Sequence, residues 1–426
     1  MFKTLVNAWK IEDLRKKLLF TLLIVVLYRI GANLPIPFLS STLESVLAAQ
    51  GGSILSYLNI LSGSAFSQAT FFALGVSPYI TAQIVVQLLT VAIPKLEEMS
   101  KDEEGRKKIE KITRYGTIVL AIITSAGYYA LLKSYSLLTN TGFFAAVVII
   151  ASHVAGSSLV MWLAEKIDAH GIGNGVSMIL FANILSRGAS VVQSFWNYLT
   201  AGTVKGVLTA VLGLIIGLGM IWFIVFMSDS ERRLPVQYAK KVVGRKMYGG
   251  QSSTLPIKVN NTGVMPIIFA SSILSIIPTI DMFVDQTEGG FWDAIFTWFS
   301  SDHWFYAVLT FVMIILFAFF YIQISFNPVE VANNLKKNGG FIPGIRPGKP
   351  TSDYITKILY KVTLIGALCL SVIAVVPLLI NVCSSGSMSG IAFGGTSIII
   401  VVGVVLETVR EIEAQMTMRH YKGFLD

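Results

Sequence analysis

Ten apolar runs, each long enough to cross a lipid bilayer, constrain this chain more than any other feature of its sequence. A helix needs roughly 20 apolar residues to span a hydrocarbon layer about 30 Å thick. Apolar residues make up 54% of the 426 residues and charged residues only 13%, which excludes a soluble globular enzyme. We therefore predict an all-α integral membrane protein with ten transmembrane helices. The runs lie at residues 18–38, 71–93, 113–133, 143–164, 175–196, 206–227, 263–281, 303–326, 358–380 and 394–412.

Basic residues are concentrated in alternate loops between these runs. Ten crossings place both termini on one side of the membrane, and that side holds 29 of the 33 Lys and Arg residues. The loops of the opposite side hold only Lys133 and Lys205, and loop 281–302 carries five acidic residues and no basic one. Because cytoplasmic loops are enriched in Lys and Arg, we expect both termini to be cytoplasmic. No small-residue cleavage site follows the first run, so we expect it to remain in the protein.

Three loops on the predicted cytoplasmic side are long and charged. Loop 94–114 mixes seven basic with six acidic residues, which is typical of a solvated helix. Loops 228–262 and 327–361 carry seven and six basic residues, each against two acidic ones. Such loops can anchor a protein at anionic lipid headgroups, or they can bind an acidic or RNA-bearing partner. Because their length exceeds what orientation requires, we favour a docking surface for a partner.

Enzymatic and ion-coupled chemistry finds little support in the sequence. There is no GxxxxGKS/T phosphate loop, no HExxH metal motif and no GxSxG nucleophile turn, and the four His residues lack metal-ligand spacing. The two Cys residues cannot form a disulfide framework. The span centres hold almost no carboxylate or His, the residues that proton or sodium coupling requires. We expect no cofactor and no metal, although an inverted-repeat secondary transporter and a membrane-embedded enzyme remain alternatives.

Two of the predicted spans are more polar than the others. Unpaired polar groups cost free energy in hydrocarbon, so these side chains should meet protein or water and not lipid. Ordinary packing between helices explains such residues, and so does a water-lined path or a seam that can open; we favour the path or seam. The polar residues are Ser77, Thr81, Gln83 and Gln87 in the second span, and Ser271, Ser272 and Ser275 in the seventh.

Branched apolar side chains four residues apart occur on the second and fifth spans. Val76 and Ile80 share one helix face, and so do Val176 and Leu180. A ring of such side chains would exclude water and block ions without a charged filter. Periodicity does not show which face points inward, and taken alone it favours exposure to lipid.

Several short strings of the sequence recur together in one family of membrane proteins. They lie in this order along nearly the whole chain: 29–37 (RIGANLPIP), the second span 73–90, 114–117 (RYGT), 171–177 (GIGNGVS), 255–260 (LPIKVN), 333–337 (NNLKK), 341–348 (FIPGIRPG) and 394–397 (GGTS). Any one string is weak evidence, whereas the ordered set is specific. In these strings the chain resembles the SecY/Sec61α family of protein-conducting channels.

The resemblance implies two pseudo-symmetric halves of five helices around a central pore. It divides the chain into a cytoplasmic segment 1–17, an N-terminal half 18–196, a C-terminal half 206–412 with basic loops at 228–262 and 327–357, and a cytoplasmic tail 413–426. It implies an apolar pore ring of Val76, Ile80, Val176, Leu180, Ile268 and Ile400. It also implies a plug near 52–66 that closes the pore at rest, with Ile54, Leu55, Tyr57, Leu58, Ile60 and Leu61.

The same resemblance implies a passive channel in the bacterial plasma (inner) membrane. Unfolded preproteins with signal sequences would cross through the ring, and their transmembrane segments would pass sideways into the membrane lipids through a lateral gate. The seven polar residues of the second and seventh spans would line that gate. SecE-like and SecG-like small subunits are the implied membrane partners. The SecA motor ATPase or the ribosome would dock on Arg232, Arg233, Lys240, Arg245, Lys246, Lys336, Lys337 and Arg346.

Overall fold

Long apolar helices form most of the molecule, because a helix satisfies its own backbone groups inside lipid. The computed structural model describes residues 2–43, 59, 62–200, 204–238, 241–243, 246–248, 252–281, 283, 296–300, 303–383 and 395–422. Six helices in this part are long and apolar enough to cross a membrane, and a bent pair makes up to seven. The chain is therefore a multi-pass membrane protein. The number of ten spans stays a prediction.

The helices of the first half cover the first five predicted spans. Pro94 follows the end of α5, and the chain turns by 105° between α5 and α6, because a proline lacks the N–H that would continue the helix. The helices are α1 (Phe2–Lys10), α2 (Glu12–Gly31), α5 (Ser77–Ala92), α6 (Pro94–Lys101), α7 (Glu103–Ser134), α8 (Phe143–His170), α9 (Gly175–Ser186) and α10 (Gly188–Thr200).

The second half contains seven helices and all five strands of the described residues. The helices are α11 (Val204–Asp229), α12 (Met265–Leu274), α13 (Ile276–Asp281), α15 (Trp304–Ser325), α16 (Pro328–Lys337), α17 (Lys349–Cys383) and α18 (Gly395–Lys422). The strands are β1 (Glu231–Tyr238), β2 (Lys241–Val243), β3 (Lys246–Tyr248), β4 (Ser252–Lys258) and β5 (Gly340–Phe341). They form a three-stranded sheet of order β4-β1-β5 and a separate hairpin of β2 and β3.

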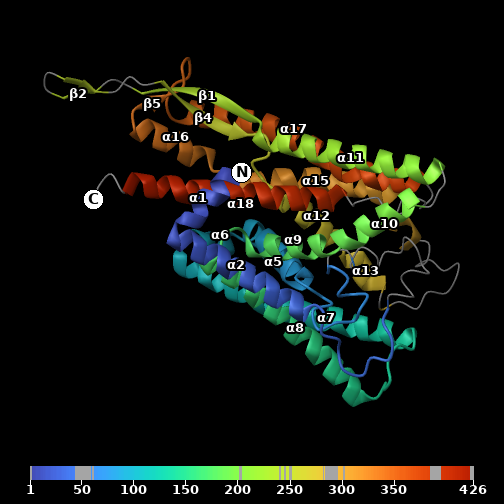
Figure 1. The fold of residues 1–426 in the computed structure, drawn as a ribbon. Helices are drawn as coiled ribbons and strands as arrows, with labels where there is room; N and C mark the ends of the chain where they lie inside the picture. Colours follow the sequence, from blue (N-terminus) through green and yellow to red (C-terminus); the bar gives the residue numbers. More distant parts are fainter. Residues whose placement is uncertain are drawn as a thin grey trace.

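The two halves lie on opposite sides of a central group of shorter helices. Figure 1 shows α2, α7 and α8 on one side and α11, α15 and α17 on the other, with α5, α9 and α12 between them. Among the contacts between the halves are those of α5 with α12 and of α9 with α18. A helix from each half therefore contributes to each of these two contacts. The pseudo-symmetry of the halves stays a prediction.

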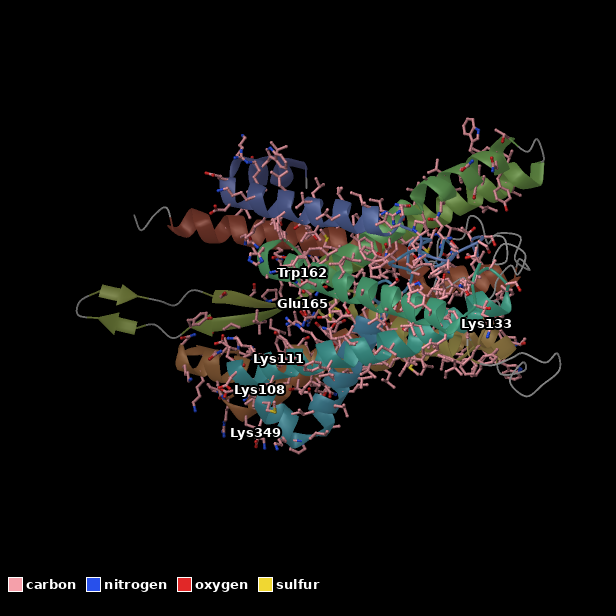
Figure 2. All side chains as sticks on the ribbon, turned by 90° about the horizontal axis from the view of Figure 1, so that it is seen from below. Lys108, Lys111, Lys133, Trp162, Glu165 and Lys349 are labelled. Carbon is pink, nitrogen blue, oxygen red and sulfur yellow. The ribbon has the colours of Figure 1, made fainter. Side chains whose placement is uncertain are left out.

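Charged side chains are distributed unequally between the two ends of the helices. Lys108, Lys111 and Lys349 lie at the end that also carries the strands, whereas Lys133 lies at the opposite end (Figure 2). We call the end with the strands the basic end. Lys133 lies at the opposite end, as expected from the alternation of basic and non-basic loops along the sequence.

The described parts of the loops at the basic end form helices and strands. The stretch 94–114 is helical as predicted, and ion pairs one helical turn apart join Lys107 to Glu103 and Lys108 to Glu104. The two other basic loops combine into a single sheet, because Gln237 pairs with Phe341 and Tyr238 with Gly340. The sequence did not indicate the pairing of β1 with β5, since these partners are about a hundred residues apart.

Candidate functional site

The six side chains predicted to form the pore ring are all buried in one continuous apolar cluster. Each is between 2 and 6% exposed. Exposure to lipid, which the spacing alone favours, is therefore wrong for these faces, because helices from both halves cover them. Val76 and Ile80 come from the start of α5, Val176 and Leu180 from α9, Ile268 from α12 and Ile400 from α18. The structure thus brings the six residues into one cluster, and their action as a ring stays a prediction.

Local sequence explains how α9 presents Val176 to this cluster. Asn174 caps the helix, and its side chain accepts a 3.0 Å hydrogen bond from the backbone N–H of Ser177. The N–H of Gly175 donates a 2.7 Å bond to the Asp168 carboxylate of α8. A side chain on Gly175 would collide with the backbone of Ala164. The glycine therefore lets α9 begin directly against α8, with Val176 pointing into the core.

The polar residues predicted to line a lateral gate lie on two helices that touch. Ser271 and Ser272 of α12 and Ser275, which caps its end, are buried. α12 packs on α5, where Gln83 and Gln87 are half-buried. Two of the hydroxyls bond within their own helices: Thr81 donates to the carbonyl oxygen of Ser77 at 3.0 Å, and Ser275 donates to that of Ser272 at 2.6 Å. Those two hydroxyls require neither water nor a partner helix, so the gate stays a prediction.

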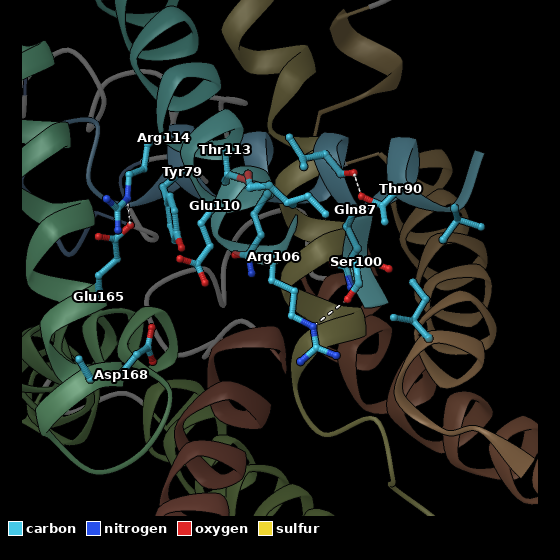
Figure 3. Close-up of a pocket in the computed structure, with 16 residues that line it drawn as sticks. Tyr79, Gln87, Thr90, Ser100, Arg106, Glu110, Thr113, Arg114, Glu165 and Asp168 are labelled. Atoms are coloured by element: carbon cyan, nitrogen blue, oxygen red, sulfur yellow. Dashed lines mark hydrogen bonds and ion pairs between the residues drawn. The ribbon is translucent and has the colours of Figure 1, made fainter. Parts of the chain in front are cut away.

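A cavity of about 830 Å³ opens beside α5 (Figure 3), and Glu165 in its wall lies on the side of the strands (Figure 2). It lies between α5, α6, α7 and α8, and Ile324 near the end of α15 closes one side. Gln83 and Gln87 line it together with residues that the sequence analysis did not single out. Those residues are Tyr79, Val86, Thr90, Val91, Ser100, Arg106, Ile109, Glu110, Thr113, Arg114, Glu165, Asp168 and Ala169.

Both signs of charge line this cavity. Arg114 of α7 and Glu165 of α8 form a 2.8 Å ion pair across one wall, and Arg106 donates a 2.7 Å hydrogen bond to the carbonyl oxygen of Ser100 (Figure 3). A wall of this kind suits a polar or charged peptide more than a lipid tail. The polar residues that α5 contributes to the cavity recur every three or four positions, so the helical period could have predicted a polar face of α5. They are Tyr79, Gln83, Gln87 and Thr90. In the described residues no group of His, Cys, Asp and Glu could hold a metal ion.

Five of the eight residues predicted to dock a partner are described as exposed at the basic end. Arg232 and Arg233 are exposed on β1, and Arg233 pairs with Glu231 at 2.6 Å. Lys336 and Lys337 form the last turn of α16, and Arg346 is exposed in the turn after β5. The sheet therefore brings candidates from both basic loops together. Lys246 begins β3, while Lys240 and Arg245 lie outside the described residues.

Further positive charge lies where this sheet meets α18. Lys258 ends β4, and its partial burial lowers the pKa of its amine, with the nearby charge of Arg410 acting in the same direction. Arg410 of α18 forms a 2.8 Å ion pair with Asp229 at the end of α11. This ion pair joins α18 to α11 next to the sheet.

The six residues predicted for the plug lie outside the described residues. The segment that follows them, 62–76, is described and is mostly buried in turns. Gly63 has a φ of +64° and fits directly against the backbone of Asn183 on α9. The structure therefore shows the C-terminal end of the predicted plug segment, residues 62–66, and the stretch that joins it to α5. The plug itself stays a prediction.

Comparison with known proteins decides between the alternatives left open by the sequence. A SecY family model matches residues 70–409. The protein translocase subunit SecY of Streptomyces griseus is 43% identical over the full length of both chains, and that of Mycobacterium tuberculosis strain H37Rv is 42% identical, also over both full lengths. The chain belongs to the SecY family.

Solved structures of SecY-family channels share the fold of this chain. A protein-conducting channel superposes with a TM-score of 0.67 at 17% identity, covering 94% of this chain and 92% of that one. Sec61 in the canine ribosome–channel complex superposes with a TM-score of 0.63 at 16% identity and the same coverage. Membership of the SecY family makes this chain a protein translocation channel subunit, which is a passive channel and not an enzyme. The transporter and enzyme alternatives are thereby excluded.

Proposed function

We propose that the buried apolar cluster contains the translocation pore of this SecY-family chain. Unfolded secretory polypeptides cross the plasma membrane between the six ring side chains, and transmembrane segments leave sideways into lipid. One observation carries this proposal: six apolar side chains from four helices of both halves converge in one cluster. A constriction of branched apolar side chains excludes ions by dewetting, yet it can widen around a peptide because no bond joins its members.

The contact between α5 and α12 is the proposed lateral gate. Neither helix contains a charged residue, so no ion pair has to break when they separate. The cavity beside α5 is the proposed entry for the peptide from the basic end, because its polar and charged walls solvate a backbone that has no secondary structure. The plug at 52–66 is proposed to close the pore on the opposite side at rest.

The basic end is proposed to face the cytoplasm and to dock a partner that supplies energy. The chain contains no phosphate-binding loop, so the work of translocation has to come from outside it. SecA or the ribosome would bind the exposed Arg and Lys residues of the sheet and α16, and Sec61 is known in a ribosome–channel complex. SecE-like and SecG-like subunits are proposed to hold the halves together from the lipid side.

Site-specific crosslinking tests the pore directly. A photoreactive residue placed at Ile80 or Ile268 should capture a secretory precursor that is stalled during export. The matched control is the same residue at Ile215 of α11, whose side chain is 59% exposed on the outer surface and should capture lipid only. Capture at both ring positions and not at Ile215 supports the pore. Absence of capture at the ring during active export would place the pore elsewhere.

A further inference from the structure

The loop between α8 and α9 is bonded to α18 of the other half. The backbone N–H of Gly173 donates a 2.8 Å hydrogen bond to the Glu411 carboxylate. The neighbouring N–H, that of Ile172, donates a 3.1 Å bond to the Thr21 hydroxyl on α2. A bond to a charged acceptor is about twice as strong as a neutral one. The Gly173–Glu411 bond is therefore a strong link between the two halves.

The fit around Gly173 is close. Its φ is +84°, a conformation that favours glycine, and a Cβ at this position would lie 3.2 Å from the Thr408 hydroxyl oxygen. That hydroxyl is itself occupied, since it donates a 2.7 Å bond to the carbonyl oxygen of Val404. The loop thus lies directly on the surface of α18.

Neighbouring side chains hold the Glu411 carboxylate in place. Gln415 donates a 3.0 Å hydrogen bond to its second oxygen, and Lys17 donates a 3.2 Å bond to the Gln415 side chain. Beneath them, Ile172 and Ile412 are buried together with Ala8 and Leu14. The carboxylate therefore faces Gly173 in a single orientation, above an apolar contact that includes α1 and α2.

The link joins the two helices that carry half of the predicted ring. Gly173 precedes Val176 of α9 by three residues, and Glu411 follows Ile400 by eleven residues on α18, about 16 Å along the helix axis. Next to Glu411, Arg410 bonds to Ser228 and Asp229 at the end of α11. These bonds hold α18 in the second half. A change at the Gly173–Glu411 bond therefore shifts α9 relative to Ile400.

Two of the contacts between the halves, α9–α18 and α5–α12, differ in strength. The α9–α18 contact contains a charge-assisted hydrogen bond, whereas the α5–α12 contact has no charged residue. We propose that Glu411 is a positioning residue, whose carboxylate holds α9 against α18 so that the halves separate at α5 and α12 and the ring stays closed at rest. This proposal rests on the pore function proposed above.

The test substitutes Glu411→Gln, which keeps the shape of the side chain and removes its charge. The matched control is Glu413→Gln, an exposed position on the same helix. Hydrogen exchange at the Gly173 amide should become about tenfold faster in the first variant, as expected for one weakened charge-assisted bond. Ion leakage and export of a precursor with a defective signal sequence should both rise severalfold, while a normal precursor is exported at the rate of the unsubstituted protein.

Conservative and independent variants separate positioning from folding. Glu411→Asp keeps the charge and should restore most of the selectivity that Glu411→Gln loses. If Glu411→Gln does not accumulate in the membrane, Gly173→Ala perturbs the same bond from the other side, and it should give the same leakage. A faster amide exchange with unchanged leakage and unchanged selectivity would overturn the positioning role. Unchanged amide exchange would overturn the link itself.

Failure of this inference is distinguishable from failure of the proposed pore. If the unsubstituted protein exports a precursor that is never captured at Ile80 or Ile268, the pore assignment fails, and the inference fails with it. If capture occurs but Glu411→Gln behaves as Glu413→Gln does, only the inference fails.

Discussion

The hydroxyl of Tyr128 on α7 donates a 2.6 Å hydrogen bond to the carbonyl oxygen of Phe66, and the two rings pack at a centroid distance of 4.8 Å. Both side chains are almost fully buried. Phe66 is the last residue of the predicted plug segment 52–66. This pair therefore anchors the C-terminal end of that segment to the first half.

Tyr128→Phe should destabilise the protein by about 1–2 kcal/mol, because a buried carbonyl loses its donor while the ring packing remains. Thermal unfolding in detergent measures the change. Tyr129→Phe is the matched control, since its hydroxyl bonds to Thr141 in an exposed position and its loss should cost under about 0.5 kcal/mol. Equal effects from the two variants would show that the buried hydrogen bond contributes no more to stability than the exposed one.

Gly156→Ala should destabilise the first half, because a Cβ on this residue of α8 would overlap the carbonyl oxygen of Phe71. The backbone cannot rotate away as a flexible side chain can. We therefore expect the free energy of unfolding to fall by about 1–3 kcal/mol. Gly217→Ala on α11 is the control, since nothing lies within 4 Å of its added methyl group. That substitution should be neutral or stabilise by up to about 1 kcal/mol. Unfolding midpoints of the two variants in one detergent decide the comparison.

Substituting Ile80 and Ile400 together by Asn should let water into the ring. An amide retains its hydration in a narrow apolar passage, so ion leakage should rise severalfold and selectivity for the signal sequence should fall. The control replaces the same two residues by Leu, which preserves volume and apolar character. Conductance in planar bilayers and export of signal-defective precursors provide the two measurements. Sealed, selective behaviour in the Asn variant would contradict a seal at these positions.

Arg346→Glu should abolish export driven by a motor while the protein stays folded and inserted. Arg346 is exposed, and within the described residues its only bond is through its backbone carbonyl, which accepts from the Thr351 hydroxyl at 2.8 Å. Reversing its charge therefore removes a contact with a partner and no internal one. Lys349→Glu, three residues away and also exposed, should retain most of the export. Normal export in the Arg346 variant would refute its docking role.

Local sequence patterns were sufficient to predict those properties that depend on residues close together in the chain. The apolar runs and the separation of Lys and Arg predicted a multi-pass helical protein, since lipid imposes one length and one composition on each span. The ordered set of short strings identified the family, which the full-length relatives confirmed.

Other features depended on contacts between distant parts of the chain. Val76 and Ile80 could have faced lipid, because a period of four residues shows that they share a face and not where that face points. The bond from Gly173 to Glu411 joins residues more than two hundred positions apart. The string 171–177 marks Gly173 but does not indicate its partner. Likewise, β5 joins β1 from a different loop.

The sequence by itself determined that the chain crosses a membrane repeatedly, how its charge is divided between loops, and which family it belongs to. Only the tertiary structure decided which apolar faces turn inward, which polar groups bond within their own helix, and where the halves are bonded together. Membrane insertion depends on the composition of each segment separately, whereas burial and bonding depend on which segments pack against each other.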